Sequence, residues 1–304
     1  MDVLFRKRMK RMASRLTPDE VAAALGDPVF ILSAPRAGST LLFSMLGNSP
    51  EVWTIGGESH GLYGQFPHLK AYDANFTSGA LDAHHADAET IAQLHLMYLA
   101  RLQNMRGEPL YDLVSHGKSH GGVFLEKTPR NALNIPFLLQ VFPTARFIFL
   151  HRDPRANIAS IMEGWQTGAT TGQFVTYRDL PGRSGPWCFL LPLGWQTLNG
   201  ASLAKIAAFQ WREANEIILR NMPSDRAIAL TYEDLVADPR GALSRLCDFC
   251  GIGMGPALEN LIDMPLSAST VSAPAKDKWR RFEAEILAQA PLFAAIEMKL
   301  RAHA

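Results

Sequence analysis

Short apolar runs and longer amphipathic stretches alternate along most of the chain. Runs rich in β-branched and aromatic side chains predict buried strands of a parallel sheet. They lie at 29–32, 51–55, 123–125, 146–150 and 226–231. Apolar positions spaced three or four residues apart predict helices, which lie at 39–46, 87–105, 154–162, 201–220 and 239–250. The alternation predicts an α/β fold with a central parallel sheet flanked by helices.

The first predicted strand leads through a tight turn into a helix. Ala37 and Gly38 in the turn are small enough to let a ligand approach the backbone, and Ser39 and Thr40 open the helix. A helix N-terminus presents unpaired N–H groups and the positive end of the helix dipole. With the guanidinium of Arg36 and two hydroxyls added, this segment predicts a cradle for a phosphate-like anion.

The cradle departs from the phosphate-binding loop of nucleotide triphosphatases. That motif reads G-x-x-x-x-G-K-[ST], whereas here Ser33 takes the first position and Ser39 takes the place of the lysine. The positive charge lies in the turn instead, at Arg36, whose planar fork of donors suits an oxyanion with several terminal oxygens. The alternative interpretation is an ordinary turn between strand and helix with a surface arginine.

A second unit of strand, turn and helix begins at 146–150. Arg152 follows the strand, Asp153 is a predicted N-cap with a proline after it, and Ser160 lies on the helix. Two such units in one chain indicate a ligand with two anionic groups. Asp153 could instead bind a metal ion at the strand end, but its predicted capping role competes with that.

Three candidate catalytic residues follow the second and third predicted strands. In an open α/β sheet, ligands bind beyond the carboxyl ends of the strands, and this is where Glu58, His60 and Lys127 are placed. A carboxylate or an imidazole there can accept a proton, and the lysine can neutralise charge on a transferring group. The alternatives are a solvated loop carboxylate, a loop histidine and a surface lysine.

Composition narrows the class of protein. Charged residues make up 19% of the chain and the formal net charge is +1, so we expect no nucleic-acid partner. Cys247 and Cys250 lie in an apolar, helix-like run, and we expect buried thiols there. The histidines between residues 84 and 120 have no rigid spacing for metal ligands, and no metal is expected. No stretch approaches the roughly 18 apolar residues of a membrane span, and the N-terminus lacks the apolar core of a signal peptide. A cytoplasmic protein is therefore expected.

With 304 residues and no repeat, low-complexity block or visible boundary, the chain is expected to form one domain, 1–304. Residues 1–27 form a basic helical segment that we expect to pack on the domain; peripheral contact with a membrane surface or an anionic partner is the alternative. Residues 61–122 and 164–200 fit none of the units above, and we expect insertions that bind or cover a substrate. The second insertion contains three tryptophans, namely Trp165, Trp187 and Trp195.

Taken together, the motifs resemble those of the PAPS-dependent sulfotransferases, and most closely the bacterial branch similar to tyrosylprotein sulfotransferases. PAPS is 3′-phosphoadenylyl sulfate. Residues 35–42, P-R-A-G-S-T-L-L, are similar to the 5′-phosphosulfate loop of that family, usually P-R-S-G-T-T-L-L. Residues 152–160 resemble its 3′-phosphate motif, and 231–235, T-Y-E-D-L, its Y-E-D-L segment. Near the C-terminus, Ser269-Thr270 and Lys278-Trp279 are similar to a pair that closes over the nucleotide.

The resemblance implies a P-loop-like three-layer fold and transfer of a sulfuryl group from PAPS to a hydroxyl or amine, leaving PAP. It implies Glu58 as the base, favoured here over His60, and Lys127 as the group that stabilises the leaving oxygen together with Arg36. The residues implied to bind the nucleotide are Arg36, Ala37, Gly38, Ser39, Thr40, Arg152, Ser160, Tyr232, Ser269 and Lys278. No bridging metal is needed for this chemistry. We expect burial to raise the pKa of the base.

One departure from the family pattern concerns the 3′-phosphate site. The tyrosylprotein branch has a basic residue where this chain has Gly164, so we expect Arg155 to substitute for it. The acceptor is expected to be a small molecule, lipid or peptide; the tryptophans and the helix from 87 favour a partly apolar one. The alternatives are an ATP-dependent small-molecule kinase, which would need a phosphate-bridging lysine and a metal-binding aspartate, and a non-catalytic nucleotide-binding protein.

Overall fold

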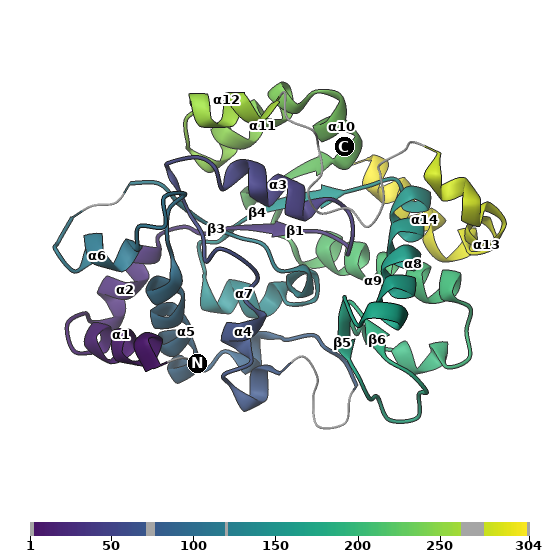
Figure 1. Ribbon diagram of the computed structural model, residues 1–304, viewed down its shortest axis with the longest axis horizontal. Helices are drawn as coiled ribbons and strands as arrows, with labels where there is room; N and C mark the ends of the chain where they lie inside the picture. The colour runs from purple at the N-terminus through teal and green to yellow at the C-terminus, as the bar shows by residue number, and fades with distance from the viewer. Residues whose placement is uncertain (1–2, 71–76, 119–120, 263–276, 303–304) are drawn as a thin grey trace.

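A five-stranded parallel sheet forms the centre of the computed structural model, which describes residues 3–70, 77–118, 121–262 and 277–302 (Figure 1). The strand order is β2-β3-β1-β4-β7. The strands are β1 (Val29–Leu32), β2 (Val52–Trp53), β3 (Val123–Glu126), β4 (Arg146–His151) and β7 (Ala227–Thr231). All four pairings are parallel, as the buried apolar runs predicted. The carboxyl ends of the strands therefore meet at one edge of the sheet.

Alternate side chains of each strand enter two different cores. Phe30 and Leu32 of β1 belong to the larger core, whereas Val29 and Ile31 belong to the smaller one. The helices of the two layers lie on opposite sides of the sheet (Figure 1). On the side of the larger core lie α5 (Ala88–Arg101), α7 (Ile135–Val141), α8 (Pro154–Thr171) and α9 (Leu203–Asn221). On the other side lie α3 (Ser39–Leu46), α11 (Pro239–Cys250) and α12 (Pro256–Ile262). The predicted three-layer α/β fold is confirmed.

The remaining helices surround this frame. They are α1 (Val3–Ala13), α2 (Pro18–Leu25), α4 (His60–Tyr63), α6 (Leu110–Val114), α10 (Tyr232–Ala237), α13 (Glu283–Leu287) and α14 (Ala290–Arg301). As expected, α1 packs on the domain: Phe5 and Met12 are buried, and Arg8 donates to the carbonyl of Ala100 in α5 at 2.8 Å. None of the helices in the described ranges is both long and apolar enough to span a membrane.

Residues 164–200, which we expected to form an insertion, contain the end of a helix and a two-stranded hairpin. Helix α8 continues past residue 162 to Thr171, and its two glycines face close neighbours. A Cβ on Gly164 would lie 2.4 Å from the ring of Phe189, and one on Gly168 would lie 2.4 Å from Cys188 Sγ. These neighbours come from a two-stranded antiparallel hairpin, β5 (Val175–Tyr177) and β6 (Trp187–Cys188). The glycines therefore allow the hairpin to pack against the helix.

The three tryptophans of this segment belong to the core. Trp187 and Trp195 are 0% and 1% exposed, and Trp165 is 7% exposed. Their rings pack edge to face, with Trp187 between the other two. The expectation that they mark an apolar surface over the substrate is wrong, because their rings pack against one another. The three cysteines are free and buried, as expected for Cys247 and Cys250.

Candidate active site

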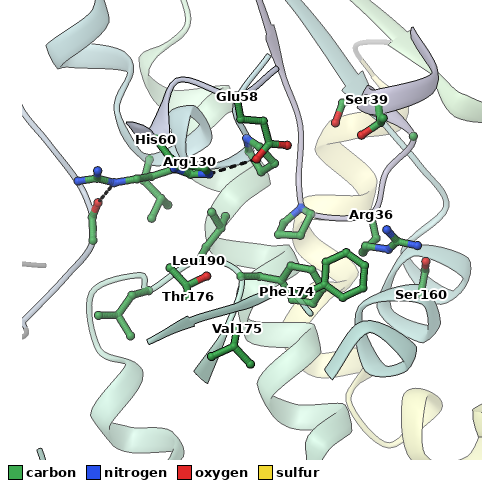
Figure 2. A pocket seen from close by; sticks show the side chains of 18 of the residues that line it. Arg36, Ser39, Glu58, His60, Arg130, Ser160, Phe174, Val175, Thr176 and Leu190 are labelled. Carbon is green, nitrogen blue, oxygen red and sulfur yellow. Dashed lines mark hydrogen bonds and ion pairs between the residues drawn. The ribbon is translucent and has the colours of Figure 1, made fainter. Parts of the chain in front are cut away.

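A cavity of about 530 Å³ opens beyond the carboxyl ends of β1 and β4 (Figure 2). Nine residues predicted from the sequence line it: Arg36, Gly38, Ser39, Thr40, Glu58, His60, Arg152, Ser160 and Tyr232. Ala37 is buried inside the same loop. Lys127 and Lys278 do not line the cavity, and Ser269 lies outside the described residues. The two strand–turn–helix units and the loop after β2 thus converge as predicted.

The turn after β1 has a backbone that few residues tolerate. Arg36 and Gly38 both lie in the left-handed region, with φ of 64° and 106°. A Cβ on Gly38 would lie 2.5 Å from the ring of Tyr232, so only glycine fits there. Gly38 is also the N-cap of α3, and no side chain caps this helix end. Its first N–H groups are left available to an anion at the cavity.

Two arginines flank this turn, and each lies against an aromatic ring. The Arg36 guanidinium lies 4.9 Å from the ring centroid of Phe174, and that of Arg152 lies 4.4 Å from Tyr232. Arg152 also donates to the carbonyl of Arg36 at 3.4 Å. The Nε atoms of both arginines are buried and have no hydrogen-bond partner among the described residues. Burial lowers the pKa of Arg36. Two half-buried arginines with unused donors are suited to binding an anion.

Ser160 lies on α8, on the same side of the cavity as Arg36 (Figure 2). Asp153 caps this helix by accepting from the N–H of Ala156 at 3.0 Å, and it pairs with Arg155 at 2.6 Å. Arg155 also lies over the ring of Trp279 and does not line the cavity. Both residues are thus engaged with each other, which argues against Asp153 as a metal ligand and against Arg155 as the substitute cation.

The predicted catalytic residues form one chain of contacts. Lys127 Nζ lies 2.6 Å from Glu58 Oε1 and 3.2 Å from Thr40 Oγ1 in the turn, so it links the carboxylate to the anion cradle. His60 Nε2 lies 3.3 Å from Glu58 Oε2, the contact drawn in Figure 2. Burial disfavours the Glu58 carboxylate, but hydrogen bonds from His60 and Lys127 outweigh burial and lower its pKa to about 2. The expectation of a raised pKa is wrong for this state of the site.

Lys278 pairs with a carboxylate rather than facing the cavity. Its Nζ lies 3.0 Å from Oε2 of Glu163, which is almost fully buried on α8, and Glu163 also pairs with Arg281. Glu163 lies one helical turn after Ser160. Nucleotide binding by Lys278 therefore remains a prediction, and it would require this pairing to be rearranged.

The other half of the cavity was not predicted residue by residue. Most of its lining comes from the hairpin and from the segment after β3, and the residues are Pro129, Leu133, Phe174, Val175, Thr176, Tyr177, Phe189, Leu190 and Leu191. Phe174 and Phe189 stack with centroids 5.3 Å apart, and both have left-handed backbones, with φ of 65° and 62°. Gly164 was the one available signal, because the ring of Phe189 occupies the space that a side chain there would need.

Arg130 supports the wall of this half. It is buried, and its three nitrogens donate to the carbonyls of Leu69, Lys70 and Gly79 at 2.8–3.0 Å. One guanidinium therefore joins Leu69 and Lys70 to Gly79, which itself lines the cavity. The sequence signal for Arg130 was its position directly after Pro129, the proline that ends the strand. This signal alone is weak.

This chain is similar to known sulfotransferases in sequence and in fold. The sequence model of the sulfotransferase family matches residues 28–183 and 192–256. A protein-tyrosine sulfotransferase of Drosophila melanogaster is 24% identical over 254 residues, 78% of this chain and 41% of its own length. The chain thus spans about two-fifths of that relative. Sulfotransferase STF9 of Mycobacterium avium has 17% identity and a TM-score of 0.52, covering 95% of this chain and 80% of its own. Mouse sulfotransferase SULT7A1, crystallised with PAP, has 12% identity and a TM-score of 0.47, covering 91% and 88%.

The likeness to the mycobacterial structure confirms the fold, and the family match includes the segments after β1 and β4. The predicted enzyme class, sulfotransferase, is that of the family. Because the match covers well over half of the chain, this protein belongs to the sulfotransferase family.

Proposed function

We propose that this protein transfers the sulfuryl group of PAPS to a hydroxyl or amine of a partly apolar acceptor, with Glu58 as general base. The observation that carries the proposal is the contact chain from Glu58 through Lys127 to Thr40. It joins a proton acceptor, a cation and an anion cradle at the edge of one cavity. In-line transfer of a sulfuryl group, like phosphoryl transfer, needs mainly positioning and charge stabilisation.

The residues present fit PAPS, which supplies an activated sulfuryl group when bound. The backbone and hydroxyls of residues 38–40, with Arg36, would hold the 5′-phosphosulfate at the uncapped end of α3. Arg152 and Ser160 would hold the 3′-phosphate, and Tyr232 would complete the nucleotide site. The unused Nε donors of both arginines are what this assignment requires.

Lys127 has two roles in this proposal. Its ammonium neutralises the charge on the leaving oxygen at the cradle, where the ammonium already contacts Thr40. Moving toward that oxygen weakens its 2.6 Å contact with Glu58. Because that contact is one of the two that hold the pKa of Glu58 low, the carboxylate becomes a stronger base when the lysine serves the donor. Proton acceptance is thus coupled to occupation of the cradle.

His60 is the second candidate for the base. In this geometry its Nε2 faces Glu58 Oε2, so it orients the carboxylate, while Glu58 contacts both the imidazole and the ammonium. Because Glu58 has both contacts, it is better placed than His60 to link the acceptor to the donor site. We therefore assign the base to Glu58 and orientation of the carboxylate to His60.

The half of the cavity lined by the hairpin and the segment after β3, which we call the acceptor half, favours a partly apolar acceptor. It does so through leucine, valine and phenylalanine side chains rather than through the tryptophans. The fly relative is named for sulfation of protein tyrosine, which makes a phenolic hydroxyl on a peptide one candidate. Phenols of small molecules and long-chain alcohols are the other two.

The test is transfer of radiolabelled sulfate from PAPS to a tyrosine peptide, a simple phenol and a long-chain alcohol, each assayed with wild type, Glu58→Gln and His60→Asn. We expect Glu58→Gln to lower kcat by about 10²- to 10⁴-fold and to leave PAP affinity unchanged, with a smaller loss for His60→Asn. Full turnover by Glu58→Gln with loss in His60→Asn would assign the base to His60. Absence of transfer to all three acceptors despite tight PAP binding would reject the proposed acceptor class.

A further inference from the structure

A cluster of buried polar side chains lies directly beneath the proposed catalytic pair. It consists of Ser59, Glu126, Thr128 and Asn131, each at most 1% exposed. We call it the Glu126 cluster. Buried polar groups of this kind are costly unless they are hydrogen-bonded to one another, and these are. The cluster lies outside the cavity lining and has no part in the mechanism above.

Hydrogen bonds converge on the Glu126 carboxylate. Ser59 Oγ donates to Oε1 at 2.7 Å, Thr128 Oγ1 donates to Oε1 at 2.5 Å, and Asn131 Nδ2 donates to Oε2 at 2.6 Å. Burial raises the pKa of Glu126, and the bonds from the two hydroxyls oppose that shift. The carboxylate therefore joins the loop after β2 to the segment after β3.

The members of the cluster are the chain neighbours of the catalytic pair. Ser59 follows Glu58 directly, and Lys127 lies between Glu126 and Thr128. The backbone N–H of Ser59 also donates to Thr128 Oγ1 at 2.7 Å, in a buried contact between residues 69 positions apart. The Thr128 hydroxyl thus accepts a hydrogen bond from the backbone of the loop that carries Glu58. It donates a hydrogen bond to the carboxylate of Glu126, the residue before Lys127.

We propose that Glu126 and Thr128 are positioning residues, which fix the backbones of the two loops so that the Glu58 carboxylate and the Lys127 ammonium stay within contact of each other and of the cradle. The inference rests on the sulfuryl-transfer function proposed above. It assigns a catalytic purpose to residues that touch neither substrate nor donor. A purely structural role would instead affect folding and leave the chemistry of the remaining folded protein unchanged.

The main test variant is Thr128→Val, which keeps the shape of the side chain but removes the hydrogen bonds of the hydroxyl with Ser59 and Glu126. Thr128→Ser restores the hydroxyl. Thr90→Val is the matched control, because Thr90 is equally buried and its hydroxyl contacts His68 at 3.0 Å, away from the cavity. Ser59→Ala, which removes one hydroxyl and keeps the backbone contact, serves if Thr128→Val does not fold.

The first readout needs no donor or acceptor. The Glu58 carboxyl is followed by ¹³C NMR in glutamate-labelled protein and assigned by comparison with Glu58→Gln. In the wild type and in Thr90→Val we expect it to stay ionised when the pH is lowered to 4. In Thr128→Val, or in Ser59→Ala to a smaller degree, it should begin to take up a proton in that range, because the contact with Lys127 is loosened.

The second readout is the rate of sulfuryl transfer between PAP and 4-nitrophenyl sulfate, followed through the nitrophenolate. Thr128→Val should lower kcat by about 10- to 100-fold, as expected when reacting groups are misplaced by about 1 Å. Thr128→Ser should stay within about 3-fold of wild type, and PAP affinity by calorimetry should be unchanged in both.

Wild-type titration of Glu58 and wild-type kcat in Thr128→Val would overturn the inference, as would an equal loss in Thr90→Val. If the wild type does not catalyse the nitrophenyl reaction, the proposed function fails for that substrate. The NMR titration then decides the positioning role alone.

Discussion

The two strand–turn–helix units of this protein present anion-binding groups in opposite ways. After β1, helix α3 begins at Gly38 with no side-chain cap, so its N–H groups are open to the cavity. After β4, helix α8 begins at Asp153, whose carboxylate accepts from the third residue along. The first unit offers backbone N–H groups to an anion, whereas the second offers only side chains, those of Arg152 and Ser160.

This difference follows from local sequence. An aspartate followed by proline caps a helix well, and a capped N-terminus has a negative charge where an anion would otherwise bind. A glycine with φ of 106° cannot supply a side-chain cap. In the proposed function, the first unit would hold the sulfuryl group that is transferred, and the second would hold the far end of the donor.

The difference between the two units is tested most directly by removing a side chain of the second unit. Arg152→Ala should weaken PAP binding by about 100-fold or more, because a partly buried charged donor is lost from its anion. Arg155→Ala is the matched control, and its effect should stay within about 3-fold, since Arg155 already pairs with Asp153. Calorimetric titration with PAP measures both. Equal losses of PAP affinity in the two variants would mean that the second unit binds PAP through its overall positive charge.

At the first unit the backbone is the target. Gly38→Ala adds a methyl group 2.5 Å from the Tyr232 ring at a backbone angle that alanine rarely adopts. Strain of this kind costs about 1–3 kcal/mol, so we expect PAP affinity to fall by about 10- to 100-fold. Gly26→Ala is a control, because it has the same left-handed requirement and open space around it. Wild-type PAP affinity in Gly38→Ala would contradict the role given to the turn.

The cap of the second unit should affect stability and leave binding intact. Asp153→Ala removes the cap of α8 and should lower the free energy of unfolding by about 0.5–2 kcal/mol, with PAP affinity within about 3-fold of wild type. Urea unfolding and PAP titration of the same preparation separate the two effects. A large loss of affinity would show that Asp153 takes part in nucleotide binding.

The smallest expected effect concerns pH. Because the pKa of Glu58 is lowered to about 2, its contribution to stability is present above its ordinary pKa near 4.5 and is lost as the pH falls toward 2. Stability of the wild type should therefore decline more steeply between pH 5 and pH 2.5 than that of Glu58→Gln. Urea unfolding across this range measures the two slopes. Parallel slopes would mean that Glu58 does not pair with Lys127 in solution.

The half of the cavity lined by the two strand–turn–helix units could largely be predicted from the sequence, because the signals for it are local. The buried run at 29–32 is followed within a few residues by the arginine, glycine and hydroxyls of the turn, and Asp153 with its proline defines the start of α8. Such contacts lie within one unit of structure. The rule that strand ends meet at one sheet edge then brings Glu58 to Lys127.

The acceptor half could not be predicted because its contacts join distant segments. Gly164 looked like the end of a helix until Phe189, 25 residues later, filled the space beside it. The tryptophans looked like a binding surface, and their burial depends on the hairpin packing against α8. The pKa of Glu58 likewise depends on hydrogen bonds from His60 and from Lys127, 69 residues away, which together outweigh the effect of burial.

The central claim is that the two units together bind a nucleotide with phosphate groups at both ends. The most direct test is calorimetric titration of the wild-type protein with PAP in the absence of metal, compared with ATP and magnesium under the same conditions. The account predicts tight binding of PAP without metal and weaker binding of ATP with magnesium. Preference for ATP with magnesium, or no binding of PAP, would contradict it.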